Sequence, residues 1–384
     1  MRKLIIFLLL LTSLISLSAQ EEYREVPFLP VLPDVMGMGG ANVATAGGYN
    51  ALFYNPAGFA MGKDSLTLLS ANPWFYINPA AAASIKDEAS AATVINQQLT
   101  EGGLGIGASL GLGLVTGGLG IGGAVVLDGS LYGHRNFMDA SGDMTITFGF
   151  VGGYALKLNL LGMKVALGAD LKPMYRVHAE LTNELAVQAM SDILRGDMGA
   201  VQEMINQAGA LCGVGIGIDL GAIAELSIFK FGLVIQDFAN TGFNYVRKPF
   251  SEVLQGGGEE VTDRYYIPMN VSIGGAIDIP LGPLESIIDP TVQADLRDVV
   301  GVIVDGRSPW TLLHIGAEAN LFKFLNPLIS TQIRAGFNQG YLTFGLGGHL
   351  LFMDLNMAVF TRELGKHIGD KPNSGFTLEL AFRL

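Results

Sequence analysis

The last nine residues place a large apolar side chain at every second position, and this period of two constrains the fold more than any other feature. Apolar residues fill every second position from Phe376 to Leu384, and Glu379 and Arg383 lie between them. Such alternation is typical of a β-strand with one apolar face, because a helix would spread the charges around all its sides. The same period recurs in 164–172, 229–236, 313–321, 329–338 and 353–359.

The composition indicates what the apolar faces of these strands meet. Only 15% of the residues are charged, and the mean hydropathy is +0.40. Water-soluble domains carry roughly 25% charged residues, so this chain has too little charge for the surface of a soluble protein of its size. We therefore predict strands that cross a lipid bilayer, with alternate side chains facing lipid and lumen.

Membrane-spanning helices are the main rival interpretation, because residues 102–127 contain no charge. Eleven of those 26 residues are glycine. Each glycine inside a helix costs about 0.8–1 kcal/mol relative to alanine. The glycine content therefore favours strands in this stretch too.

The predicted fold is an all-β membrane protein, a transmembrane barrel of about 14 antiparallel strands in residues 63–384. An even strand number is usual for bacterial barrels. The candidate strands lie near 65–71, 104–112, 119–127, 144–157, 163–176, 211–222, 224–237, 265–278, 289–298, 310–322, 330–338, 340–348, 350–362 and 374–384.

The connections between these strands alternate in length. Outer loops of such barrels are long and periplasmic turns are short, so the long connections 72–103, 177–210 and 238–264 predict that both termini are periplasmic. The connection Asn338–Tyr341 is short where an outer loop is expected. Helical spacing predicts short helices in two outer loops, between Thr182 and Ala208 and, more weakly, over 80–99.

The two ends of the chain point to export to the cell outer membrane. Residues 1–19 contain Arg2 and Lys3, an apolar run and small residues before the expected cleavage, which is the pattern of a signal peptide. The last strand resembles the signal by which barrel-assembly machinery inserts outer-membrane proteins, although it ends in Leu384 where phenylalanine is usual.

Residues 20–62, between the predicted signal peptide and the predicted barrel, form the remaining region. It contains the run Met36-Gly37-Met38-Gly39-Gly40-Ala41 and the turn Asn55-Pro56-Ala57. Glycine permits tight turns, Pro56 fixes its own backbone angle, and the Asn55 side chain can bond neighbouring backbone groups. These properties suit a segment that turns sharply in a crowded space.

This combination resembles the start of FadL-type hydrophobic-compound transporters and of the related PorV-type outer-membrane proteins. Similarity to the PorV-type branch continues over 215–222, 313–318 and 334–341. In the FadL branch a hatch plugs a fourteen-stranded barrel, and ligands pass sideways through the wall near a kinked strand. The resemblance implies that residues 20–62 are an N-terminal hatch, which plugs the lumen over about 34–62. It transfers no ligand-contacting residue, because no ligand motif of the fatty-acid branch is present.

Nine polar residues are predicted to face the lumen. They form a selective path in one interpretation; in the other, which we favour, they pair with one another or anchor the plug, since a barrel lumen is polar by default. These residues are Lys164, Asp170, Lys172, Asp295, Arg297, His314, Glu318, Arg334 and Asp354.

Several functions are disfavoured. Without its signal peptide the chain has 21 basic and 35 acidic residues, a net charge of −14, which opposes nucleic-acid binding. The lone Cys212 and five unclustered histidines predict no metal site and no cofactor. Nucleophile-elbow and dinucleotide-like patterns within 107–123 lack the helix that each requires, so no enzyme activity is expected.

Three functions therefore remain open. The first is passive transport of small hydrophobic molecules such as long-chain fatty acids. The second is a PorV-type partner platform for secretion or surface attachment, and the third is a structural porin or surface antigen. In each case the lipid bilayer of the outer membrane is a partner, and a hydrophobic small molecule is a partner in the first.

Overall fold

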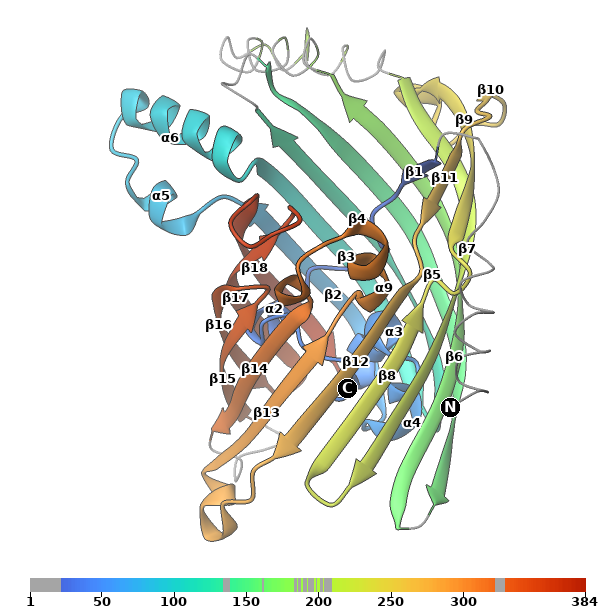
Figure 1. Cartoon of the computed structure of the whole chain (residues 1–384), viewed down its shortest axis with the longest axis vertical. Helices are drawn as coiled ribbons and strands as arrows, with labels where there is room; N and C mark the ends of the chain where they lie inside the picture. The colour runs from blue at the N-terminus through green and yellow to red at the C-terminus, as the bar shows by residue number, and fades with distance from the viewer. Residues whose placement is uncertain are drawn as a thin grey trace.

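The computed structural model is a closed antiparallel β-barrel with short helices inside it (Figure 1). It describes residues 22–133, 139–160, 162–182, 209–321 and 329–384, with scattered residues between 183 and 208. The predicted signal peptide lies outside the described residues. No helix in the described ranges is long and apolar enough to cross a membrane.

Fourteen strands form the wall in these described ranges, and β18 closes it by pairing antiparallel with β2. The predicted fold class is therefore confirmed. Twelve strands are continuous: β2 (Ser65–Tyr76), β3 (Leu104–Thr116), β4 (Leu119–Tyr132), β5 (Ser141–Leu160), β6 (Met163–Leu181), β7 (Gly209–Leu226), β13 (Ile288–Leu296), β14 (Leu313–Leu321), β15 (Ile329–Asn338), β16 (Tyr341–Leu350), β17 (Met353–Glu363) and β18 (Pro372–Arg383).

The other two wall strands are interrupted. One consists of β8 (Phe229–Gln236) and β9 (Thr241–Pro249), and its neighbour consists of β11 (Arg264–Ile267) and β12 (Asn270–Asp278). Four residues, 237–240, face only two, 268–269, across the interruption. Most of the interrupted segment has left-handed backbone, at Asp237, Ala239 and Asn240. The expectation of an outer loop over 238–264 is wrong for 241–249, which continue the wall.

We call the end of the barrel with the long connections the loop end and the opposite one the turn end. The loop end holds α5 (Pro79–Ala83), α6 (Glu88–Glu101), η2 (Phe250–Glu252), β10 (Glu259–Glu260), α9 (Val299–Asp305) and η4 (Pro309–Leu312), and the turn end holds η3 (Gly282–Ser286). The helix expected over 80–99 is present as α5 and α6. The helix expected between Thr182 and Ala208 lies largely outside the described residues.

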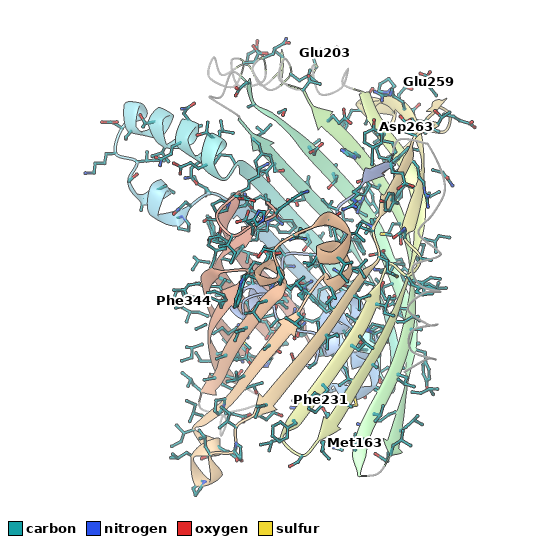
Figure 2. All side chains as sticks on the ribbon, in the orientation of Figure 1. Met163, Glu203, Phe231, Glu259, Asp263 and Phe344 are labelled. Atoms are coloured by element: carbon teal, nitrogen blue, oxygen red, sulfur yellow. The ribbon has the colours of Figure 1, made fainter. Side chains whose placement is uncertain are left out.

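Side chains of the wall alternate as predicted. In β18, Leu378 and Leu380 point outward and are exposed, whereas Thr377 and Glu379 point inward and are fully buried. Figure 2 shows Phe231 and Phe344 projecting from the outer face. In a membrane protein this exposed apolar face is the surface that lipid covers.

The wall is much taller on one side than on the other. β5, β6 and β7 contain 20, 19 and 18 residues, but β13 and β14 contain 9 each. About 9–11 residues suffice for a tilted strand to cross a bilayer. In Figure 1 the long strands rise above the rest at the loop end. Their outward Val177 and Cys212 are buried there, in a cluster that includes Phe250 and Val253.

Residues 25–62 fill the middle of the lumen as the plug. Its helices are α2 (Pro33–Gly37), α3 (Gly48–Tyr54) and α4 (Gly58–Met61), drawn in blue within the barrel in Figure 1. Leu32, Leu52 and Phe53 are almost fully buried in the resulting core.

The chain reaches the plug from the loop end. β1 (Glu22–Arg24) pairs in parallel with β11, and the chain then descends through the lumen to β2, which begins at the turn end beside Leu384. The start of the described chain and its C-terminus therefore lie at opposite ends of the barrel. The N-terminus itself lies outside the described residues, so the expectation that both termini are periplasmic stays a prediction.

Candidate functional site: the plugged lumen

The plug divides the lumen into two cavities. The cavity toward the loop end, of about 520 Å³, is lined by Val26–Val31 and Met36 of the plug and by polar side chains of the wall. The cavity toward the turn end, of about 340 Å³, is lined by Asp34, Asn42 and Asn50 of the plug and again by polar wall residues. Helix α2 and the turn after it separate the two cavities, and we call this part, residues 33–43, the partition.

The partition needs glycine because it runs against the backbone of the wall. Gly39 has a left-handed backbone, and a Cβ atom there would lie 2.4 Å from the carbonyl oxygen of Ile315. At Gly37 a Cβ atom would lie 2.9 Å from the Cα of Gly345. No side chain fits at such distances, so the glycine-rich run is what lets the partition reach the wall.

Wall side chains hold the partition by its peptide groups. Asp295 accepts hydrogen bonds from the backbone N–H of Asn42 (2.6 Å) and Val43 (2.8 Å). Arg297 donates to the carbonyl oxygen of Gly40 at 2.9 Å. His314 Nδ1 lies 2.7 Å from the carbonyl oxygen of Gly39. Three of the nine residues predicted to face the lumen, Asp295, Arg297 and His314, therefore contact the partition.

Two neutral wall residues complete this set of clamps. Thr343 donates to the carbonyl oxygen of Gly37 and accepts from the N–H of Gly39. Gln293 donates to the carbonyl oxygen of Ala41. The sequence analysis missed both residues, because a neutral polar side chain on an inward face carries no signal of its own. The only clue is the position of Gln293, two residues before Asp295 on the same face.

The Asn55-Pro56-Ala57 turn docks on the opposite side of the lumen. Asn55 donates to the carbonyl oxygen of Val43 at 2.9 Å, and its Oδ1 accepts from the N–H of Ala57 at 3.1 Å. A Cβ atom at Gly221 of β7 would lie 2.0 Å from Asn55 Oδ1, and one at Gly168 of β6 would lie 2.5 Å from Pro56. The turn therefore docks where Gly168 and Gly221, which lack side chains, leave room on the inner face of the wall.

A charged cluster ties the start of the plug to the tall side of the wall. The buried Glu25 carboxylate lies 2.8 Å from His178 Nδ1 and 3.1 Å from Arg176 Nη1, and it accepts from the Tyr245 hydroxyl at 3.0 Å. Burial raises the pKa of Glu25, but the hydrogen bond and charge of His178 and the charge of Arg176 outweigh burial and hold this pKa below its ordinary value. Arg176 also donates to the carbonyl oxygen of Val26 at 2.8 Å.

The interruption of β8–β9 lies over a second buried charged cluster. Lys172 Nζ is 2.8 Å from Asp219 and 3.6 Å from Asp237, and Asp170 is buried directly opposite Asp219 in the β6–β7 ladder. The Asp219 carboxylate also accepts from the N–H of Asp237, in place of the ladder partner that the interruption removes. These charges hold the irregular backbone rather than the partition.

The remaining predicted lumen residues are spread toward the turn end. Glu318 and Arg334 form a 2.5 Å ion pair beside the smaller cavity. Asp354 pairs with Arg383 of the closing strand at 2.8 Å. Lys164 is exposed near the turn between β5 and β6. Within the described ranges, no group of three or more His, Cys, Asp or Glu is arranged to hold a metal ion.

Among the comparisons with known proteins, the one with solved structures found matches. No family model and no curated protein matches the sequence. The CymD monoaromatic hydrocarbon channel aligns with a TM-score of 0.50 at 13% identity, over 93% of this chain and 98% of that one. This chain has the FadL-type barrel fold.

Two other FadL-type structures align somewhat less well. The toluene transporter TodX of Pseudomonas putida has a TM-score of 0.47 at 10% identity, over 94% of this chain and 98% of its own. The toluene transporter TbuX of Ralstonia pickettii has a TM-score of 0.47 at 12% identity, over 93% and 98%.

What this chain shares with CymD is the fold, a closed fourteen-stranded antiparallel barrel. In this chain the wall is interrupted between β8 and β9. The ladder from β3 to β4 and from β4 to β5 is continuous.

Proposed function

We propose that this protein is a passive channel for small hydrophobic molecules across the outer membrane, with long-chain fatty acids among its cargo. The observation that carries the proposal is the partition between the two cavities. It is fastened by hydrogen bonds from wall side chains to plug backbone, so it can move without unfolding the wall. If the partition shifts, the two cavities become one path through the lumen.

The larger cavity supports an apolar cargo with a polar end. Its plug side is formed by the apolar run from Val26 to Val31, and its wall side includes Arg297 and Arg362. An apolar body lying on the plug loses no hydrogen bonds to water, and a polar end meets donors on the wall.

Uptake measurements test this function. Cells without the protein should accumulate labelled long-chain fatty acid several-fold more slowly than wild-type cells, and the intact gene should restore the rate. The double variant D295A/R297A removes two clamps and should admit cargo faster than wild type. K164Q, whose side chain lies away from the partition, should match wild type. Unchanged uptake of fatty acid and of toluene in cells without the protein would rule the function out.

We also propose that cargo leaves sideways, through the interruption of β8–β9. Unpaired backbone inside a membrane is tolerated only where protein buries it or where it lines a cavity. The interruption replaces ladder bonds with side-chain bonds: Asn240 Oδ1 accepts from the N–H of Met269 at 2.8 Å. Phe238 and Asn240 are exposed on the outer face at this point.

A reversible cross-link tests the exit. In a C212A background, the pair N240C/M269C joins the two interrupted strands when it is oxidised. We expect uptake to fall to the rate of cells without the protein and to recover when a reductant is added. Each single cysteine variant serves as the control and should transport normally under both conditions. Full uptake by the oxidised pair would exclude this exit.

A further inference from the structure

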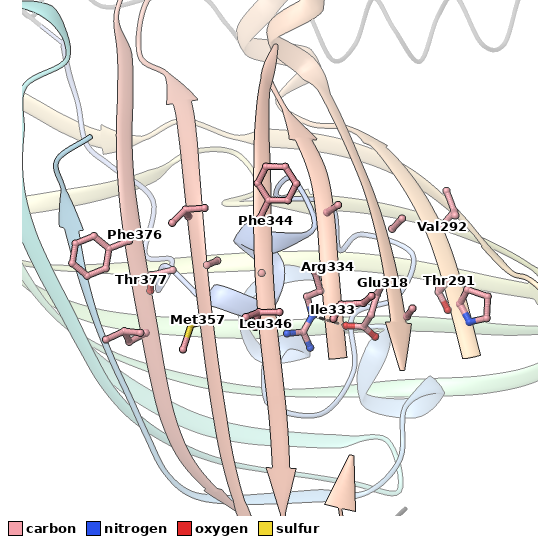
Figure 3. A pocket seen from close by; sticks show the side chains of 18 of the residues that line it. Thr291, Val292, Glu318, Ile333, Arg334, Phe344, Leu346, Met357, Phe376 and Thr377 are labelled. Atoms are coloured by element: carbon pink, nitrogen blue, oxygen red, sulfur yellow. Dashed lines mark hydrogen bonds and ion pairs between the residues drawn. The ribbon is translucent and has the colours of Figure 1, made fainter. Parts of the chain in front are cut away.

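An apolar groove lies on the outer face of the barrel, not in its lumen. It runs over β13 to β18, has a volume of about 820 Å³, and is seen from close by in Figure 3. Its floor is shallow because the outward positions there are alanines, Ala317, Ala319 and Ala335. Its sides are larger outward side chains, among them Phe344, Leu346, Met357 and Phe376.

The groove offers an occupant almost no polar partner. Glu318 and Arg334 line it only from the lumen side, where they pair with each other. Thr377 likewise turns inward and donates to the carbonyl oxygen of Val31 in the plug. Since buried polar groups need hydrogen bonds, the chemistry of the groove selects a hydrocarbon.

The occupant must come from the membrane. The ladders that join β13 to β18 run without a register shift, so the wall between groove and lumen is closed. Cargo in the lumen therefore has no route to the groove through these strands. Around this part of the wall, the hydrocarbon at high concentration is the acyl chains of lipids.

A loop helix roofs one end of the groove. Pro79, the first residue of α5, belongs to its lining. Figure 1 shows α5 and α6, in cyan, projecting sideways from the barrel at the loop end, above β16 and β18. A larger groove of about 1020 Å³ lies over β2–β7 and β9, but no helix residue lines it. We call Pro79 and the helix α5 that it begins the roof of the groove, and their position at its end distinguishes this groove from the one over the opposite wall.

We propose that this groove, under α5, is a binding site for one acyl chain of an outer-membrane lipid. Apolar contact alone gives no preference inside a bilayer, because lipid tails are as apolar as the wall. The preference comes from shape: the alanine floor and the roof let one chain make van der Waals contacts on several sides. The site is independent of transport and of the identity of the cargo.

Lipid retention during purification tests the site. The protein is extracted from outer membranes in a mild detergent, and bound lipid is counted and identified by native mass spectrometry. Wild type should retain one lipid per barrel. A335W, which fills the groove floor, should retain at least fivefold less. A169W is the matched control: it places the same side chain at an exposed alanine on the outer face of β6, and it should retain as much as wild type.

Two further variants keep the test decisive. If A335W gives no folded, heat-modifiable barrel, A317L fills the groove with a smaller change. Replacing 79–83 with a glycine-serine linker removes the roof and leaves the wall intact, and it should lower retention as well. The proposal is overturned if wild type retains no lipid, if groove and control variants retain equal amounts, or if the retained molecule is a free fatty acid or an arene.

Discussion

The glycine at position 221 is required by a side chain that belongs to another part of the protein. Asn55 of the plug occupies the space that a Cβ atom at Gly221 would need, and the same holds for Pro56 at Gly168. Fitting extra carbon atoms into a packed site typically costs 1–3 kcal/mol. The residues of the plug turn therefore require glycine at the two wall positions that they contact.

The G221V substitution tests this dependence. The valine side chain should displace the Asn55-Pro56-Ala57 turn and destabilise the plugged barrel by about 1–3 kcal/mol. The readout is the temperature at which the folded, fast-migrating form is lost on gels. G242V is the control, because a Cβ atom at Gly242 would have no atom within 4 Å. Equal stability of both variants would mean that the turn does not dock at Gly221.

From the sequence, a site residue could be predicted only where its side chain is charged or titratable and its position in a strand faces inward. Asp295, Arg297 and His314 were selected as charged or titratable residues on inward faces, and the structure brings them to the partition. Lys164 met the same criterion, but it lies beyond the plug at the turn end. Gln293 and Thr343 could not be predicted, because their role depends on the plug backbone groups that lie opposite them in the folded protein.

At the scale of elements, alternation located the strands wherever lipid covers their outer face. It failed for β9, where the apolar residues face inward instead: Phe243 and Tyr245 are buried in the lumen, and Asn244 is exposed. The turn-forming residues at 237–242 also looked like the start of a loop. The pattern reverses because the inner face of this strand packs on protein.

The closing strand gives a prediction at this scale. Deleting residues 376–384 removes the partner of both β17 and β2 and leaves two unpaired edges in lipid, each costing several kcal/mol per lost bond. We expect no heat-modifiable barrel in the membrane. Deleting 22–24, which removes only β1, should leave insertion normal. A folded barrel in the first truncation would contradict the architecture.

For the whole molecule, the path of the chain through the lumen bears on its orientation. We propose that the loop end faces the outside of the cell and that Leu384 lies in the periplasm. A membrane-impermeant maleimide should then label E259C, at the loop end, on intact cells. It should label N159C, at the turn end, only after the outer membrane is broken. The reverse pattern of labelling would invert the orientation.

The clamps on the partition bind peptide groups, and every residue carries the same peptide group. Asp295, Arg297, Gln293 and Thr343 therefore recognise the course of the plug backbone rather than the identity of its side chains. Beyond the glycines that permit close approach, the plug is free to change its side chains without loosening its hold. Related barrels can thus acquire differently lined cavities, and different cargo, while the fastening of the plug stays the same.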